Sequence, residues 1–263
     1  MRSFQAKDFE KAVGPMARTY ASPIAPPVCA VCAGTGWLRR AVPFGAPDWG
    51  TVVACECTLQ QSQAELSRRL PPAQRAMTFC NFQPYSLSQK EAMALALELA
   101  SAAPGFSSLL LIGRVGVGKT HLAAAAVSWY QQEASDAGRL GSARLVYVPA
   151  LLDGWQAAQE DGLDGFEEAY RPWRDRGLLA LDDLGAEKDT AWRLEKLSRL
   201  VNDRWESRLP TIVTTNLHSQ AWLAGMPQDL RTAGERIISR IADQRPGWSR
   251  VVEMLGRDAR GGG

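Results

Sequence analysis

The sequence lacks a long apolar run: no stretch reaches the roughly 18 residues that a membrane-spanning helix needs. The first residues, Met1–Lys11, mix charged with apolar side chains and lack the apolar block of a secretory signal peptide. The net charge of +2 is too small to indicate a nucleic-acid partner by itself. These absences predict a protein without a membrane partner that remains in the cytoplasm.

Cysteine is also scarce, with five residues among 263. In the reducing cytoplasm, cysteines are more often reduced, bound to a metal or inert than paired in disulfides. Hydrophobic residues make up 46% of the chain and charged residues 22%, a balance that allows a sizeable core and argues against general disorder. The length suits one large domain and one small one.

Prolines divide the chain into two parts of different character. Ala21–Pro27 is rich in proline, and Pro71 and Pro72 follow later. The segment between these breaks contains many turn-forming residues and has little apolar material for a core of its own. We therefore predict a small N-terminal domain with its linker over residues 1–75 and a large domain over residues 76–260.

In the large part, short apolar runs alternate with helical patterns, which is typical of βαβ units around a parallel sheet. An α/β fold with three layers is therefore expected. The predicted strands are Leu109–Ile112, Leu145–Val148, Leu178–Leu181, Ile212–Thr215 and Val251–Met254, and the predicted helices are Gln89–Ala102, Lys119–Ala134, Thr190–Arg208 and Glu235–Ala242.

A glycine-rich loop follows the first predicted strand. Residues 113–120 fit G-x-x-x-x-G-K-T and lead into a good helix former, which is the setting that this phosphate-binding motif requires. The glycines let backbone N–H groups point at phosphate oxygens, and the helix start adds its positive dipole end. A loop without a ligand is the alternative, but strand, loop and helix together favour an ATP site. The residues assigned to nucleotide binding are Gly113, Gly116, Val117, Gly118, Lys119, Thr120 and His121.

Two carboxylates, Asp182 and Asp183, close the predicted strand at Leu178–Leu181. In folds of this kind the ligand lies at the carboxyl ends of the strands. Asp182 would then hold Mg²⁺ through water, with the Thr120 hydroxyl as a magnesium ligand, and Asp183 would orient and deprotonate the attacking water. The alternative is a turn that happens to be capped by aspartate.

With these motifs in place, the chain from about Thr78 onward resembles the helicase-loader and IstB-type branch of the AAA+ ATPases. It is most similar to the DnaC/DnaI-like loaders of bacterial replicative helicases. The resemblance rests on GRVGVGKTHLA, DDLG, TTNL and ERIISR, which occur in this order over about two-thirds of the chain. It implies a P-loop AAA+ fold with a central parallel sheet and ATP hydrolysis. Because most AAA+ proteins carry glutamate where this chain has Asp183, the hydrolysis is expected to be slow or conditional.

Further roles are implied by the resemblance alone. Asn216 matches sensor 1, which positions the attacking water, although an asparagine that caps a turn is the alternative. Arg240 matches the arginine finger that acts on a neighbouring subunit's nucleotide, and Arg236 is the other candidate; ordinary solvated arginines are the alternative. The chain ends soon after Val251–Arg260 without a C-terminal helical lid. This implies an active site that is completed by self-association.

Two chelating cysteine pairs, Cys29-x-x-Cys32 and Cys55-x-Cys57, lie in the N-terminal part. Four thiolates suit tetrahedral Zn²⁺, and a closed shell of four protein ligands makes such a site structural. Four unrelated reduced thiols are the alternative. The DnaI-like loaders carry a similar arrangement in the N-terminal part that docks on the helicase, which implies a hexameric replicative helicase as partner. Cys80 stands apart and is expected to be buried without a role.

The leading hypothesis is an ATP-dependent loader that places the replicative DNA helicase onto single-stranded DNA during replication initiation or restart. An IstB-type transposition helper ATPase is the alternative, and the ATPase motifs do not separate the two. A kinase would share the P-loop but would need a lid over its acceptor, for which the sequence offers no candidate.

Weak candidates for DNA contacts are Trp37 with Arg39 and Arg40, and Trp173 with Arg171, Arg174 and Arg176.

Overall fold

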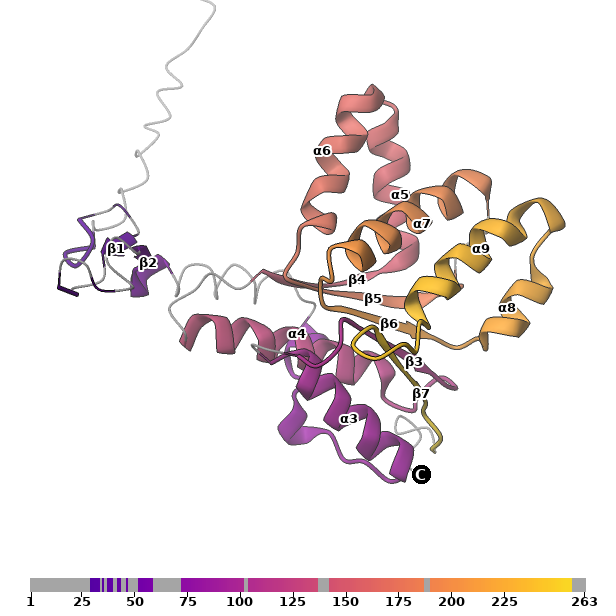
Figure 1. Cartoon of the computed structure of the whole chain (residues 1–263), viewed down its shortest axis with the longest axis horizontal. Helices are drawn as coiled ribbons and strands as arrows, with labels where there is room; N and C mark the ends of the chain where they lie inside the picture. The colour runs from indigo at the N-terminus through magenta and orange to yellow at the C-terminus, as the bar shows by residue number, and fades with distance from the viewer. Residues whose placement is uncertain are drawn as a thin grey trace, which may run out of the picture.

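The computed structural model describes residues 29–33, 35, 37–39, 42–43, 46, 52–58, 72–101, 104–136, 142–186 and 190–256. Within these residues lie a two-stranded sheet near the N-terminal end and a five-stranded sheet in the large part (Figure 1). Among the helices of the described residues, none has the length and apolar character that crossing a bilayer requires.

The five strands of the large sheet are β3 (Ser108–Ile112), β4 (Ala143–Tyr147), β5 (Leu178–Leu184), β6 (Thr211–Thr215) and β7 (Ser249–Glu253). They are all parallel and lie in the order β4-β5-β6-β3-β7. β3, which leads into the glycine-rich loop, is therefore central, and β6 separates it from β5. This sheet confirms the predicted α/β class, because parallel neighbours need helical crossover connections.

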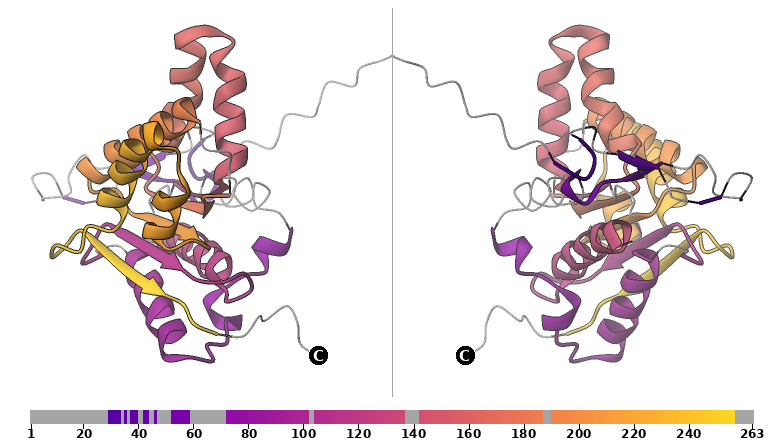
Figure 2. Two further views of the ribbon diagram at one scale, coloured as in Figure 1. Left: turned by 90° about the vertical axis from the view of Figure 1, so that its right-hand side faces the viewer. Right: turned by 90° about the vertical axis from the view of Figure 1, so that its left-hand side faces the viewer.

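Helices cover both faces of this sheet and give three layers (Figures 1 and 2). One face carries α3 (Leu87–Leu99) and α4 (Lys119–Asp136), whereas the other carries α7 (Ala191–Glu206), α8 (Ser219–Gly225) and α9 (Gln228–Ile241). Between β4 and β5, α5 (Val148–Gln159) and α6 (Gly162–Arg174) form a hairpin that projects beyond the sheet. The short helix α2 (Pro72–Arg75) and the 3-10 turn η2 (Phe79–Asn81) precede α3 and contact α4.

Alternate residues of each strand face the two helical layers. In β3, Leu109 and Leu111 pack on the side of α3 and α4, whereas Leu110 and Ile112 face the side of α7 and α9. Because successive side chains of a strand point to opposite faces, both faces of this strand must be apolar. This explains why the strands appear in the sequence as continuous apolar runs.

The structure corrects the ends of several predicted elements. The strand predicted to end at Leu181 is β5, which runs to Leu184 and so includes Asp182 and Asp183. Val148, which the sequence places at the end of a strand, begins α5, since Pro149 in the first helical turn favours a helix start there. The predicted helix Glu235–Ala242 is part of α9, which begins earlier, at Gln228. The prediction also omits α5, α6 and α8.

The small sheet pairs β1 (Trp37–Arg39) with β2 (Val52–Ala54) in antiparallel fashion. The first cysteine pair lies in the turn before β1, and the second begins directly after β2. A two-stranded sheet of this size is marginal in water without further support. The cysteines are therefore placed where a metal ion would hold the two strands together at the open end of the hairpin.

Candidate functional site

The glycine-rich loop connects the end of β3 to the start of α4 at Lys119. Gly116 and Gly118 have φ angles of 86° and 96°, which glycine adopts without steric cost. A Cβ atom at Gly118 would also lie 2.6 Å from Cε2 of Phe82, which is closer than side chains can approach. These two glycines therefore allow both the turn and the tight packing of the loop against the segment before α3.

Lys119 is buried, with 6% of its surface exposed. Its ammonium donates hydrogen bonds to the carbonyl oxygens of Gly113 at 2.7 Å and Arg114 at 2.9 Å, and to Oδ1 of Asn216 at 2.8 Å. All three acceptors are neutral. Because hydrogen bonds to ionised acceptors are stronger, a phosphate group in the loop would compete well for this ammonium.

Asp182 lies near the end of β5 and is held by two hydroxyl groups. Thr120 Oγ1 donates to Oδ1 of Asp182 at 2.9 Å, and Thr214 Oγ1 donates to the same oxygen at 2.6 Å. Burial raises the pKa of the Asp182 carboxyl above its usual range, although these hydroxyl groups oppose the shift. A divalent cation would favour the ionised form. The Thr120 and Asp182 oxygens are thus adjacent and of the type that Mg²⁺ prefers.

Asp183 lies where the register between β5 and β6 shifts. Its φ angle is 63°, in the left-handed region that aspartate tolerates better than most residues. Its backbone N–H donates to Thr214 Oγ1 at 2.9 Å, and its Oδ1 accepts a hydrogen bond of 2.7 Å from Nδ2 of Asn216. The Asn216 amide, which also accepts from Lys119, therefore bridges the loop lysine and this carboxylate.

These polar residues line a pocket of about 420 Å³ at the carboxyl edge of the sheet. His121 also lines it, and its Nε2 lies 2.9 Å from the carbonyl oxygen of Thr78. Met77 and Tyr147 also line the pocket. The pocket thus joins the glycine-rich loop, the acidic strand end and the segment before α3, as expected for a ligand at the carboxyl ends of parallel strands.

Two residues of this site are missing from the sequence prediction. Thr214 contacts both aspartates, and its position depends on β6 lying next to β5. Gln89 Nε2 donates to the carbonyl oxygen of Val117 at 3.1 Å and so holds the glycine-rich loop. The S-x-x-Q pattern at Ser86 and Gln89 indicates a capping box in the sequence, but not this contact. The Val117 side chain itself is buried in the core, which leaves its backbone for the loop.

The arrangement can hold a triphosphate in the loop, a magnesium ion beside Thr120 and a water molecule near Asp183. We expect Asp183→Asn to lower ATP hydrolysis on the order of 100- to 10,000-fold, because the amide cannot accept the proton of the attacking water. The affinity for ATP should change little, since the amide has the same size. Phosphate release and calorimetric titration measure the two effects. Hydrolysis at the wild-type rate would exclude Asp183 as the base.

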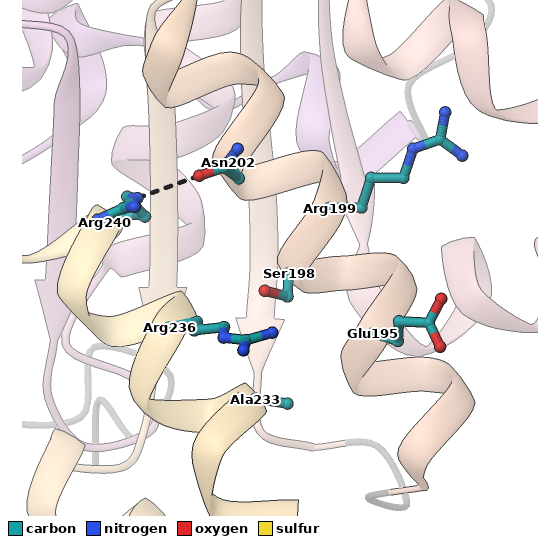
Figure 3. A pocket seen from close by; sticks show the side chains of 7 residues that line it. All are labelled: Glu195, Ser198, Arg199, Asn202, Ala233, Arg236 and Arg240. Atoms are coloured by element: carbon teal, nitrogen blue, oxygen red, sulfur yellow. Dashed lines mark hydrogen bonds between the residues drawn. The ribbon is translucent and has the colours of Figure 1, made fainter.

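Arg236 and Arg240 do not line this pocket. They line a separate pocket of about 450 Å³ between α7 and α9, and both side chains extend from α9 toward α7 (Figure 3). The two pockets share no lining residue.

The four N-terminal cysteines converge on one point. Their Sγ atoms all lie within 4.8 Å of one another, with Cys29 and Cys55 3.9 Å apart and Cys32 and Cys57 3.6 Å apart. Zinc bound tetrahedrally at about 2.3 Å from each sulfur places the sulfurs about 3.8 Å from one another. The cluster therefore fits a Zn²⁺ site, as the spacing predicts. Burial and the neighbouring thiols raise the pKa of Cys57 to about 12, and a bound cation would favour its thiolate form.

Cys80 differs from its prediction, since its side chain is exposed. In η2 the preceding residue, Phe79, turns into the core and Cys80 faces outward. Cys80 lies outside the cluster of four cysteines.

We expect the chain to bind one zinc ion per copy, and the double variant Cys29→Ser, Cys32→Ser to lose it. Hydroxyl groups are poor zinc ligands, and a sheet of two three-residue strands is marginal without further support. The thermal midpoint of the large domain should stay unchanged. Elemental analysis and thermal unfolding measure both effects, with Cys80→Ser as the matched control. Zinc content that persists in the double variant would contradict this ligand set.

The structure does not support the candidate DNA contact at Trp173, and part of the candidate near Trp37 lies outside the described residues. Arg40 and the side chain of Trp37 lie outside the described residues. The guanidinium of Arg144 lies over the Trp173 ring, 4.5 Å from its centre, and Arg174 forms an ion pair of 2.7 Å with Asp175. One face of Trp173 is thus covered by protein, which weakens its case as a stacking platform for a base.

The sequence matches a family model described as IstB-like ATP binding protein over residues 59–257. The match covers the glycine-rich loop, both aspartates and the arginine pair. It begins after the cysteine cluster, which therefore lies outside the matched region.

Three curated relatives share part of the sequence. The uncharacterized protein YdaV of Escherichia coli is 26% identical over 180 residues, which cover 68% of this chain and 67% of YdaV. An ATP-binding protein in an insertion sequence of Mycobacterium tuberculosis is 28% identical over 186 residues, or 69% of this chain and 70% of that protein. The replicative helicase loader DnaI of Bacillus subtilis is 31% identical over 109 residues, or 41% of this chain and 32% of DnaI.

Solved structures share the fold. A crystal structure of DnaI superposes with a TM-score of 0.58 at 22% identity and covers 71% of this chain and 95% of that chain. The crystal structure of the DnaC helicase loader gives a TM-score of 0.54 at 23% identity, covering 70% of this chain and 100% of that chain.

Proposed function

Within the family of IstB-like ATP-binding proteins, to which the chain belongs, we propose that it loads the replicative DNA helicase onto single-stranded DNA in the cytoplasm. In this proposal, residues 76–260 form the ATPase domain, and residues 1–75 form the zinc-binding domain, with its linker, that contacts the hexameric helicase. ATP binding and hydrolysis set when the helicase is held and when it is released.

One observation carries the ATPase part of the proposal: Lys119, Thr120, Asp182, Asp183 and Asn216 converge on a single pocket. ATP occupies the glycine-rich loop, and Lys119 binds its terminal phosphates. Thr120 and Asp182 hold Mg²⁺, which neutralises phosphate charge when it is bound. Asp183 accepts the proton of the attacking water, and Asn216 orients that water.

Self-association completes the site in this proposal. Arg240 lies at another pocket of its own chain, so it serves the nucleotide that a neighbouring copy binds. There it stabilises the negative charge that grows on the phosphate in the transition state. Hydrolysis per chain then depends on protein concentration and on whatever promotes assembly.

The cysteine cluster favours a helicase-loading function over the other functions considered for this family. It is a built site of four converging sulfurs, and it lies outside the region that the family model matches. A module added to a shared ATPase domain is suited to recognise a partner particular to this chain. The partial similarity to the DnaI of Bacillus subtilis, which is described as a replicative helicase loader, supports the same choice.

The second candidate is an ATPase that assists a transposase on duplex DNA. It is supported by the relative from a Mycobacterium tuberculosis insertion sequence, which matches over a longer segment than DnaI does. The ATPase pocket serves both functions equally well. The partner therefore has to be identified by experiment.

Co-purification with the replicative helicase of the same organism separates the two candidates. The wild-type chain should form a stable complex, and the double variant Cys29→Ser, Cys32→Ser should lose it because the zinc-binding domain no longer holds its shape. The matched control Cys80→Ser should bind as the wild type does. Binding that is unaffected by loss of the zinc ligands, or stimulation of a transposase without any helicase complex, would contradict the loader assignment.

A further inference from the structure

The side chain of Arg240 is held in place by two different contacts. Its Nε donates a hydrogen bond of 3.1 Å to Oδ1 of Asn202 on α7 (Figure 3). Its guanidinium carbon lies 4.2 Å from the centre of the Trp205 ring, one helical turn further along α7. Planar guanidinium groups stack favourably on aromatic faces. Arg240 is therefore ordered by α7 before any partner arrives.

The contact with Asn202 is itself oriented. Nδ2 of Asn202 donates to Oε1 of Glu206 at 2.9 Å, which fixes the amide so that its oxygen faces Arg240. The hydrogen bond uses Nε and leaves the two terminal nitrogens of the guanidinium without a hydrogen bond to any described residue. These terminal N–H groups form the fork that binds phosphate oxygens in pairs.

Trp205 belongs to a longer stack of planar groups. The Trp248 ring is stacked on it, with ring centres 4.2 Å apart and planes inclined by 27°. Because a stacked ring covers the face on which it lies, Arg240 occupies the other face of Trp205. The guanidinium carbon of Arg208 lies 3.7 Å from the Trp248 centre and covers the far end. The stacked groups are thus Arg208, Trp248, Trp205 and Arg240, and the guanidinium carbon of Arg245 also lies 5.0 Å from the Trp248 centre and 5.8 Å from the Trp205 centre.

The stack is anchored in the fold next to Trp205 and at Arg208. Arg204, next to Trp205, is 1% exposed and donates to the carbonyl oxygens of Pro210 at 2.7 Å and Arg176 at 2.8 Å. Arg208 donates to the carbonyl oxygen of Gly247 at 3.0 Å, beside Trp248. The last turn of α7 therefore cannot shift without breaking the hydrogen bonds of the buried Arg204, and Trp205 is a rigid platform.

Arg236 provides the contrast. It lies one helical turn before Arg240 and lines the same pocket, but it is exposed and its side chain bonds to no described residue. Holding a free arginine in one conformation costs rotamer entropy when it binds a ligand. The structure therefore distinguishes the two arginines, which the sequence leaves as alternatives.

We infer that Trp205 and Asn202 are positioning residues that hold the Arg240 guanidinium in the orientation required to reach the nucleotide of a neighbouring copy. This inference rests on the proposed function, in which Arg240 acts between copies. A guanidinium that is already aligned stabilises transition-state charge without reorganising. The stack thus holds Arg240, in the pocket between α7 and α9, in the orientation in which it assists hydrolysis at another copy's glycine-rich loop.

Two readouts on the full-length protein test the inference. The first is the Arg240 Nε–Hε resonance by NMR, which the Trp205 ring current should displace. We expect Trp205→Leu to remove this displacement and Trp205→Phe to retain part of it. Trp129→Leu, which changes a partly exposed tryptophan on α4, is the matched control and should leave the resonance unchanged.

The second readout is the ATPase rate per chain at increasing protein concentration. We expect Trp205→Leu to lower the plateau rate on the order of 10- to 100-fold, with unchanged ATP affinity and an unchanged concentration at half-plateau. Trp205→Phe should recover part of the loss. A purely structural role would instead lower the thermal midpoint or raise the half-plateau concentration. Asn202→Ala should lower the plateau rate by a smaller factor than Trp205→Leu does. Because it removes little volume, it keeps the test valid if Trp205→Leu folds poorly.

The outcomes separate this inference from the proposed function. If Arg240→Ala lowers the plateau but Trp205→Leu and Asn202→Ala do not, the positioning roles are wrong and the action of Arg240 between copies stands. If Arg240→Ala itself leaves the plateau unchanged, that action is wrong and the inference fails with it. Loss of the ring-current displacement in Trp205→Leu together with a wild-type plateau also refutes the inference.

Discussion

Lys119→Ala should lower the affinity for ATP by roughly 100-fold or more, because hydrogen bonds to a charged group contribute about 1.5–3 kcal/mol each and the ammonium would make more than one to the phosphates. In the structure this ammonium is surrounded by two loop carbonyl oxygens and by Oδ1 of Asn216. Alanine leaves these acceptors in place and removes the positive charge opposite the phosphates.

Calorimetric titration with ATP and Mg²⁺ measures this loss. Lys90→Ala, which removes an exposed lysine of α3, is the matched control and should bind ATP as the wild type does. The thermal midpoint of both variants shows whether the large domain remains folded. A folded Lys119→Ala variant with wild-type affinity would mean that ATP does not bind in the glycine-rich loop.

Arg240→Ala should lower the assembly-dependent ATPase rate on the order of 1,000-fold, as expected when an arginine that stabilises transition-state charge is lost. ATP affinity should stay unchanged, since Arg240 does not line the ATP pocket of its own chain. Because the arginine and the ATP pocket would belong to different copies, mixing Arg240→Ala with Lys119→Ala should restore activity. The Lys119→Ala copies then supply Arg240 to the nucleotides bound by the Arg240→Ala copies.

Rates of phosphate release from each variant and from the mixture test this complementation. The control is a mixture of the single variant Lys119→Ala with the double variant that carries both Lys119→Ala and Arg240→Ala. This mixture contains no intact glycine-rich loop and should stay inactive. Two inactive variants that remain inactive when mixed would argue against a site shared between copies. Equal loss of activity in isolated monomers of Arg240→Ala would place the effect within one chain.

The local features of the site can be predicted from the sequence. Gly116, Gly118 and Lys119 form a motif whose strand, turn and helix are adjacent in the chain, so its geometry follows from the residues themselves. Asp182 and Asn216 are expected at the same edge because parallel strands end there. The four cysteines are predictable in the same way, since their spacing alone suits one metal site.

Contacts that depend on strand order cannot be predicted in this way. Thr214 reaches Asp182 because β6 is inserted between β3 and β5, which only the folded sheet determines. The stack of Arg240 on Trp205 joins two helices whose pairing depends on the tertiary fold. Neither contact has a local sequence pattern.

The missed helices have a different cause. In the segment of α5 and α6, Gly154, Gly162 and Pro172 interrupt the helical pattern and indicate turns. The structure uses Gly162, with a φ angle of 88°, at the start of α6, and accommodates Pro172 near the end of that helix. In α9, Gly234 weakens the pattern, but its small size lets Met226 approach closely.

The most direct test of the loader assignment is helicase transfer onto a closed circle of single-stranded DNA, which a hexameric ring cannot enter without opening. With ATP and the wild-type chain, the replicative helicase of the same organism should become retained on the circle and unwind an annealed oligonucleotide. The double variant Cys29→Ser, Cys32→Ser should not support this transfer. If the wild-type chain, folded and binding ATP, leaves the helicase off the circle, the account of this protein as a helicase loader is wrong.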